Sequence, residues 1–200
     1  MKLIKGFITV IGIIGILVII ALVTGYYLYL LTPPIQAEMY DPGQSREAFE
    51  SFNQKFESFE TEVKDAVDAG EEKELSLVIT EKEINSKLIE VLAEGELPLR
   101  EILVNFGKEA FMIYAKVDVP GVDARIGAKG QIQALDGGLK VAIEDFDLGK
   151  LPLPQAATNG VEEVVNIMLK LRLADWPLEI TNVEIRNREL TVVGLTRTAD

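Results

Sequence analysis

The chain has 200 residues, contains neither cysteine nor histidine, and carries a formal net charge of −12 at pH 7. The lack of cysteine excludes disulfide bonds and a thiol nucleophile, and the lack of histidine removes a usual zinc ligand and the common general base near neutral pH. So acidic a chain also argues against nucleic-acid binding, which needs a basic face.

A long apolar run stands at the start of the chain. From Phe7 to Leu31 there is no charged residue. Because a bilayer core takes about 20 helical residues to cross, the run predicts a transmembrane helix, which Pro33 and Pro34 end. The alternative is a cleaved signal peptide, but its apolar core would be about 7–15 residues long and followed by small residues. We expect residues 1–37 to form a cytoplasmic N-terminus and an uncleaved anchor.

The basic residues predict the orientation of this anchor. Lys2 and Lys5 precede the run, and the next basic residue is Arg46. The positive-inside rule then leaves the N-terminus in the cytoplasm and the rest of this single-pass plasma-membrane protein outside it. All 32 acidic residues and 18 of the 20 basic ones follow the run, which gives the outer part a net charge of −14. This charge argues against electrostatic adhesion to anionic lipid.

Residues 38–72 predict an amphipathic juxtamembrane helix. Asp41 and Pro42 are typical of the N-cap and first turn of a helix, which should run to about Gly70. One apolar stripe recurs at spacings of three and four, formed by Phe49, Phe52, Phe56, Phe59, Val63 and Val67. The stripe could pack on the protein's own domain, pair with a second copy or lie on lipid. The first is favoured, because Phe is a poor coiled-coil seam residue and an acidic polar face does not suit anionic membrane.

Residues 73–200 predict one α+β ectodomain with an antiparallel curved sheet packed on two helices. A strand over 74–79 leads into the capping box Thr80–Glu83 and a short helix that Gly95 closes. Alternating apolar residues then predict an antiparallel meander, with strands over 102–106, 111–119, 122–134 and 139–143. A second amphipathic helix over 161–171 and a hairpin around Asn187 follow.

Small residues along the predicted strand over 122–134 suggest a ligand groove. Ala124, Ala128, Gly130 and Ala134 would leave a shallow wall, which either lets a helix sit close or lines a groove. The predicted ligand-binding residues lie on these strands and on the facing helix: Ile113, Val117, Ala124, Ile126, Ala128, Ile132, Val164 and Met168. The alternative is an ordinary filled core between helix and sheet.

The sequence contains no convincing catalytic constellation. None of its serines lies in a Gly-x-Ser-x-Gly setting. Asp145 and Asp147 form the best carboxylate pair, and could hold Ca²⁺ or act as paired acids, but such a pair is more often a solvated strand end. We expect no enzymatic activity, no cofactor and no metal.

Several segments together carry a resemblance to known envelope proteins. Leu77 to Asn85, which reads LVITEKEIN, resembles the strand-to-helix entry of bacterial YpmS-type proteins. The run LGKLPLP from Leu148 to Pro154, a helix, and then 178–185 and 190–194 are similar to the C-terminal part of LmeA-like proteins. The resemblance covers about 75–195 and implies a tubular lipid-binding (TULIP-like) fold with an apolar groove. Its motifs are structural, so no catalytic residue is carried over.

Two hypotheses about function follow. The first is a membrane-anchored, extracytoplasmic, non-enzymatic module that binds or handles a lipid or another apolar ligand between sheet and helix. The second is a structural or regulatory ectodomain that binds a protein partner of the cell envelope, with a dimer through the Phe-rich helix as one form. Both give the chain the bilayer as a partner through its N-terminal helix, and neither involves nucleic acid.

Overall fold

The computed structural model describes residues 24–25, 33–95, 99–117, 124–149, 151–152, 159, 162, 166 and 177–197. Its helices are η1 (Pro34–Glu38), α2 (Arg46–Asp68) and α3 (Glu81–Ala93). Its strands are β1 (Glu74–Thr80), β2 (Leu99–Phe106), β3 (Phe111–Val117), β4 (Arg125–Leu135), β5 (Gly138–Leu148), β6 (Leu151–Pro152), β7 (Leu178–Arg186) and β8 (Glu189–Thr196). The predicted α+β class is confirmed.

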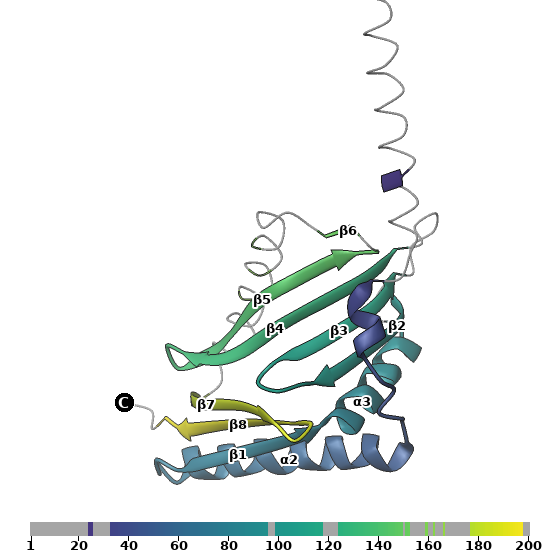
Figure 1. Ribbon diagram of the computed structural model, residues 1–200. Helices are drawn as coiled ribbons and strands as arrows, with labels where there is room; N and C mark the ends of the chain where they lie inside the picture. Colours follow the sequence, from purple (N-terminus) through teal and green to yellow (C-terminus); the bar gives the residue numbers. More distant parts are fainter. Residues whose placement is uncertain are drawn as a thin grey trace, which may run out of the picture.

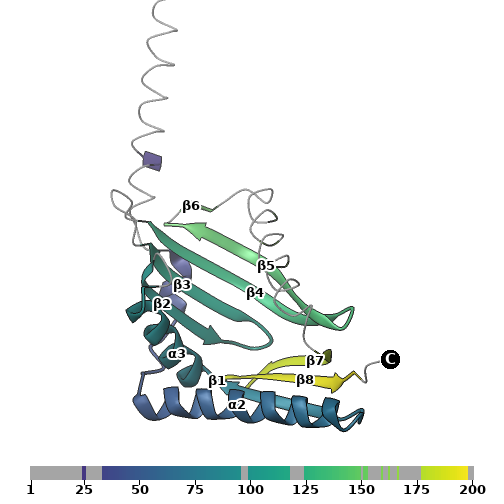
Figure 2. The same cartoon turned by 180° about the vertical axis from the view of Figure 1, so that it is seen from behind.

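The strands form two antiparallel sheets instead of the single sheet that the sequence predicted. β2, β3, β4, β5 and β6 lie in that order in a five-stranded sheet, and β1, β8 and β7 form a three-stranded sheet (Figures 1 and 2). The two meet where the Ile180 amide of β7 donates to the carbonyl of Gly137 in the β4–β5 turn. The prediction was wrong here because alternation shows that a segment is a strand but does not show which strand it pairs with.

Two of the hairpin turns contain residue types that favour positive φ. Asp136 and Gly137 join β4 to β5 with φ of 53° and 74°, and Asn187 and Arg188 join β7 to β8 with φ of 53° and 66°. Two-residue turns with positive φ match the twist of the flanking strands, and Gly, Asn and Asp adopt that conformation most readily. These turns confirm the two predicted hairpins.

Helix α2 begins later than predicted. Its N-cap is Ser45, whose side chain accepts a hydrogen bond from the Ala48 amide, and the helix starts at Arg46. Asp41 instead accepts a bond from the amide of Gly43, whose φ of +74° is incompatible with a helix. The turn at Asp41 and the true cap at Ser45 use the same chemistry, so the sequence alone favoured the wrong one.

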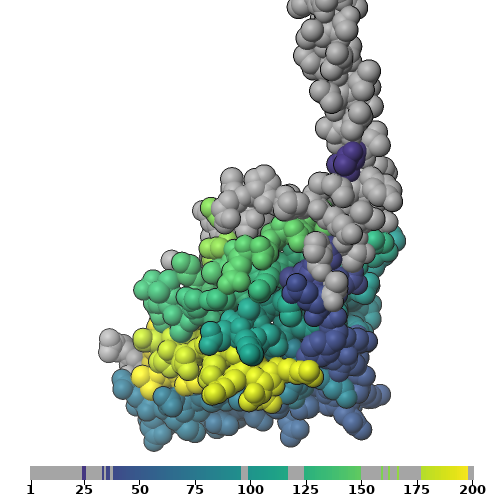
Figure 3. All heavy atoms as spheres, viewed as in Figure 1, coloured from purple at the N-terminus to yellow at the C-terminus, as the bar shows by residue number. Residues whose placement is uncertain are grey.

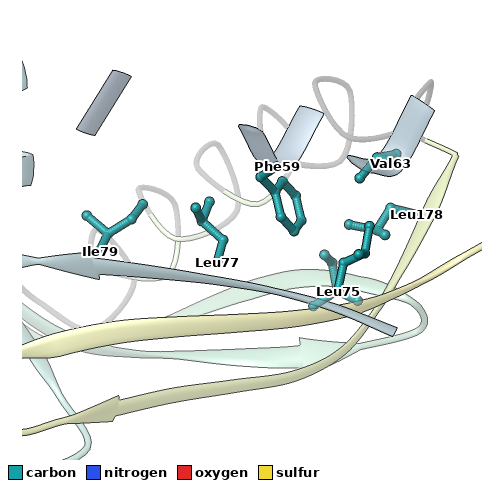
Figure 4. Packing of buried hydrophobic residues seen from close by; sticks show 7 residues of the cluster. Phe59, Val63, Leu75, Leu77, Ile79 and Leu178 are labelled. Atoms are coloured by element: carbon teal, nitrogen blue, oxygen red, sulfur yellow. The ribbon is translucent and has the colours of Figure 1, made fainter. Parts of the chain in front are cut away.

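The apolar stripe of α2 packs on the protein's own sheet, which was the favoured alternative. Phe59 and Val63 are buried in one core cluster with Leu75, Leu77, Ile79, Leu178 and Ile180. Figure 4 shows the Phe59 ring pointing from α2 toward the strands, among the leucines of β1. Phe52, Phe56 and Val67 pack against the same cluster while remaining partly exposed. The surface proposed for a Phe-helix dimer is therefore largely used within the domain.

Residues 33–41, which we call the 33–41 segment, lie on one face of the five-stranded sheet. Helix η1 of this segment contacts β3 and β4 (Figures 1 and 3). A Cβ built on Gly127 would lie 2.5 Å from Ile35 Cγ2 and 2.8 Å from Pro33 Cβ, so this contact requires glycine. Further along, the Tyr40 amide donates to Asn105 Oδ1, and Asn105 Nδ2 donates back to the Tyr40 carbonyl, each at 3.1 Å. The chain before α2 is thus fixed to the sheet at two places.

The predicted transmembrane helix over 7–31 lies outside the described residues, apart from Thr24 and Gly25. Within the part of the chain that the structure describes, no helix is long and apolar enough to cross a membrane.

Candidate functional site

One face of the five-stranded sheet is apolar from β2 to β5. Cross-strand partners point to the same face, so the ladder arranges these side chains in rows. The first row is Ile102, Ala115, Ile126 and Leu148; the second is Val104, Ile113, Ala128 and Phe146; the third is Phe106, Phe111, Gly130 and Ile143; and Ile132 and Val141 make a fourth. We call this the inner face, and the face that carries the 33–41 segment the outer face.

The structure brings four of the eight predicted ligand residues to the inner face, namely Ile113, Ile126, Ala128 and Ile132. Ala124 is buried just before β4. Val117 pairs with Leu99 at the end of β3, and nothing is described of its side chain. Val164 and Met168 lie outside the described residues. The proposed groove between sheet and second helix therefore stays a prediction.

Rows two to four contribute to a filled core. Val104, Phe106, Phe111, Val141 and Ile143 form a buried cluster with Ile185 of β7, and Ile113, Ile132 and Phe146 pack against it. Ile84 and Leu88 of α3 and Leu190 of β8 cover the same cluster. This part of the inner face is thus occupied by the protein's own side chains.

The first row differs from the others. Among the described residues, neither core cluster includes Ile102, Ile126 or Leu148, and all three side chains are partly exposed. Ala115, the small residue between Ile102 and Ile126, is buried. Ile102 also lines an open pocket of about 350 Å³ at the β2 edge, between Ile89 and Leu92 of α3 and the 33–41 segment. The first row is therefore the part of the inner face best placed to meet something other than the core.

The first row also lies at the end of the sheet where the chain arrives from the N-terminal apolar run. Ile126 is next to Gly127, against which Pro33 packs from the outer face. Only Thr32 separates Pro33 from Leu31, the end of the apolar run. A helix crossing the membrane over 7–31 would thus place this end of the sheet beside the bilayer.

A cluster of polar side chains surrounds the start of α3: Glu81, Glu83, Asn85 and Ser86 are buried and Thr80 is half-buried, and we call these five residues the α3 polar cluster. Thr80 and Glu83 form the predicted capping box, and Glu83 also binds Ser51 and Lys55 of α2. Asn85, only 1% exposed, donates to the Val104 carbonyl at 2.7 Å and accepts from the Val104 amide at 2.9 Å. The cluster therefore ties α2 and the free edge of β2 to α3.

Glu81 connects this cluster to the 33–41 segment. Its carboxylate accepts bonds from the Phe106 amide of β2 and from the Tyr40 hydroxyl. Arg188, in the β7–β8 turn, lies 4.5 Å from the centre of the Tyr40 ring. Three distant parts of the chain meet at this carboxylate, although nothing in the sequence around Glu81 indicates that it is buried.

On the opposite side of the sheet, a Glu and an Asn also cover the part of β5 with which β6 does not pair. Asn166 donates to the Val141 carbonyl and accepts from the Val141 amide, both at 2.7 Å, and Glu162 accepts from the Ile143 amide at 3.0 Å. Glu81 and Asn85 bind Phe106 and Val104 in the same arrangement on β2. A Glu and an Asn four residues apart on a helix thus cover an unpaired strand edge twice, which protects both edges from pairing with other chains.

The buried polar side chains of the described residues are all hydrogen-bonded within the protein. Among the described residues, every buried side-chain nitrogen and oxygen atom has a hydrogen-bond partner. No group of acidic residues in the described part of the chain is arranged to hold a metal ion. Asp145, of the predicted carboxylate pair, is exposed and lies opposite Lys129 in the ladder. Burial, and then the charge of Asp145, raise the pKa of Asp147.

The two buried glutamates of the α3 polar cluster differ in electrostatics. Burial raises the pKa of Glu81, and the Phe106 amide and the positive charge of Arg188 only partly offset this. Burial acts in the same sense on Glu83, but hydrogen bonds from Lys55, Ser51 and Thr80 outweigh it and lower the pKa of that carboxyl. Ionised Glu81 therefore costs stability in the fold, whereas ionised Glu83 contributes stability.

The pH dependence of stability should separate these two residues. Below the ordinary pKa of 4.5, Glu81 is protonated in both states; as pH rises, the unfolded state loses its proton first, so stability falls until the higher folded pKa is passed. Glu81→Gln should therefore gain stability relative to the unmodified protein as pH rises above about 4.5. Glu83→Gln should behave oppositely, losing relative stability as pH rises through the window below 4.5. Urea unfolding of both variants from pH 3 to 8 tests this, and parallel curves would contradict it.

Comparison of the chain with protein-family models, with curated proteins and with solved structures gives no match.

Proposed function

We propose that this protein is a membrane-anchored, extracytoplasmic, non-enzymatic module that binds a lipid or another apolar ligand at the first row of the inner face. The observation that carries the proposal is the partial exposure of Ile102, Ile126 and Leu148, which continue an apolar face beyond the filled core. Isolated exposed apolar residues are ordinary, whereas partly exposed apolar side chains on neighbouring strands of one sheet face are typical of a surface that binds an apolar ligand or a membrane.

The position of the row supports a lipid as the ligand. Pro33 packs behind it and follows the apolar run after one residue, Thr32, so the anchor would hold the row beside the bilayer. Moving an acyl chain from bilayer to protein exchanges one apolar surrounding for another, so the transfer itself is nearly neutral. A site of this kind needs an open apolar surface near the membrane more than it needs strong polar contacts. Tethering also raises the effective concentration of protein at that surface.

The remaining predictions fit the same proposal. Lys2 and Lys5 favour a cytoplasmic N-terminus, which would put the ectodomain on the outer side of the plasma membrane. The YpmS-type and LmeA-like motifs favour a TULIP-like arrangement, with the five-stranded sheet curling around a helix to enclose the ligand. LVITEKEIN, the first of these motifs, contains most of the α3 polar cluster, so its role would be to hold the sheet and not to touch the ligand.

Photocrosslinking of lipid to the sheet tests the proposal. The full-length chain would be placed in nanodiscs with a phospholipid carrying a diazirine in its acyl chain, and the adducts located by mass spectrometry. We expect adducts at the first row, and about a tenfold loss in Ile126→Gln, because burying an isoleucine side chain is worth about 1.5–3 kcal/mol.

Leu135→Gln is the matched control, because Leu135 is also an apolar residue of β4 but is 51% exposed at the far end of the strand. Its adduct yield should equal that of the unmodified chain. Labelling of the apolar run without labelling of the sheet would overturn the proposal, since the probe would then have been present and the row would not have bound it.

A further inference from the structure

The outer edge of β1 is an unpaired strand edge. β1 pairs with β8 along its whole length, and no described strand lies on its other side. In an antiparallel ladder, successive residues direct their amide and carbonyl groups alternately toward and away from the partner strand. The Lys73 carbonyl accepts from Thr196 on the β8 side, whereas the Val78 carbonyl accepts from Lys55 and the Thr80 amide donates to Glu83 on the opposite side. Glu74, Ser76 and Val78 therefore direct their backbone groups outward.

Side chains close only one end of this edge. Lys55 reaches the Val78 carbonyl at 3.0 Å and Glu83 reaches the Thr80 amide at 2.8 Å. A lysine over an edge strand is a common protection against pairing with another chain. The edge from Glu74 to the Val78 amide has no such cover among the described residues, in contrast to the two edges of the five-stranded sheet.

A groove runs along the uncovered part of the edge. Its volume is about 370 Å³, and it lies between α2 and β1. Gln54, Ser58 and Glu62 line it on the α2 side, Ser76, Leu77 and Val78 line it on the β1 side, and Phe59 contributes to its wall. A strand added at this edge would direct alternate side chains toward α2 and toward the solvent side that Ser76 faces.

Charge around the groove decides which occupant fits. Glu62 lines it, Glu74 is the first residue of β1, and Glu71 and Glu72 precede that strand; all four are exposed. The nearby cations are engaged, since Lys55 lies 2.8 Å from Glu83 and Lys73 lies 3.7 Å from Glu62. A second copy of the chain would bring the same acidic helix to this edge, and like charges in contact are unfavourable. A basic segment would be attracted.

We propose that the outer edge of β1 binds an extended segment of a partner protein, with alternating apolar and basic residues, as an additional strand. Main-chain hydrogen bonds to Glu74, Ser76 and the Val78 amide supply affinity in this mode of recognition, and the side-chain pattern supplies specificity. The apolar side chains face the Phe59 wall of the groove, and the lysines or arginines, on the side that Ser76 faces, meet Glu74. This proposal does not depend on lipid binding at the inner face.

Peptide binding with an edge-blocking variant tests the proposal. The full-length chain, in nanodiscs of zwitterionic lipid, is titrated with a fluorescent octapeptide of alternating valine and lysine, and empty nanodiscs correct for binding to lipid. Ser76→Pro removes an outward amide at an edge position, where proline is tolerated, so the sheet should remain folded. We expect Ser76→Pro to weaken binding at least tenfold, Ser76→Thr to leave it unchanged, and a valine–glutamate octapeptide not to bind.

Amide hydrogen exchange on the unmodified chain gives a second readout that does not depend on how the proline variant folds. The Ser76 and Val78 amides should exchange more slowly when the valine–lysine peptide is bound. Lack of binding at millimolar peptide, equal binding by Ser76→Pro, or unchanged exchange at Ser76 would each overturn the proposal. A dimer in sedimentation experiments that Ser76→Pro dissociates would also overturn it, because the occupant would then be a second copy.

Discussion

Phe59→Ala should reduce the free energy of unfolding by about 3–5 kcal/mol, the usual cost of truncating a buried aromatic residue. The ring is 5% exposed and lies in a cluster with Leu75, Leu77 and Leu178, which cannot collapse into the vacated space without moving two sheet strands (Figure 4). Urea unfolding followed by circular dichroism measures the loss, with the slope of the transition checked for two-state behaviour.

Phe49→Ala is the matched control on the same helix. Phe49 is partly exposed, and its ring stacks with the ammonium group of Lys87 at 5.1 Å, a contact worth about 1 kcal/mol or less near a surface. The expected loss is therefore about 1 kcal/mol. If both variants lost the same free energy of unfolding, Phe59 would not hold α2 against β1. The Phe stripe would then be available to a partner.

The spacing of apolar residues predicted much of this fold. The Phe stripe of α2 has the three- and four-residue spacing of a buried helix face, and its seating on the sheet followed from the acidic character of the other faces. The meander from β2 to β5 followed from alternation, and the turns at Asp136 and Asn187 from residues that tolerate positive φ. These features depend on neighbours in the sequence, so they can be inferred without knowing the fold.

Long-range pairings could not be inferred in this way. β1 pairs with β8, more than a hundred residues later, and the hydrophobic pattern of both strands would suit many other partners. The 33–41 segment packs on Gly127, a glycine that in the sequence resembles any other small residue of its strand. The small-residue wall was interpreted as a groove partly because of Gly130, but a Cβ there would lie 2.3 Å from the Ala142 carbonyl oxygen. That glycine serves close packing within the sheet at a β-bulge.

The polar residues of the α3 polar cluster were the least predictable part of the candidate site. Asn85 lies on a helix among apolar residues, which is unfavourable for a solvent-facing role and indicates a buried partner. The sequence does not show that the partner is the edge of β2, nor that Asn166 does the same for β5. The signal in the sequence was a glutamate four residues before an asparagine, at Glu81 and Asn85 and again at Glu162 and Asn166.

Asn85→Leu should therefore destabilise the protein by about 3 kcal/mol or more. Leucine has a similar shape but leaves the Val104 amide and carbonyl without partners at a site too closed for water, and each buried unpaired group costs about 1–3 kcal/mol. Asn166→Leu removes the same two bonds from Val141, but Asn166 is only half-buried, so water can replace part of what is lost. We expect a loss of about 1 kcal/mol in the free energy of unfolding for that variant.

Denaturant unfolding gives both values, and amide exchange at Val104 and Val141 shows whether each strand edge has opened. If Asn85→Leu costs no more than Asn166→Leu, the β2 edge is held by the packing of α3 and not by the asparagine.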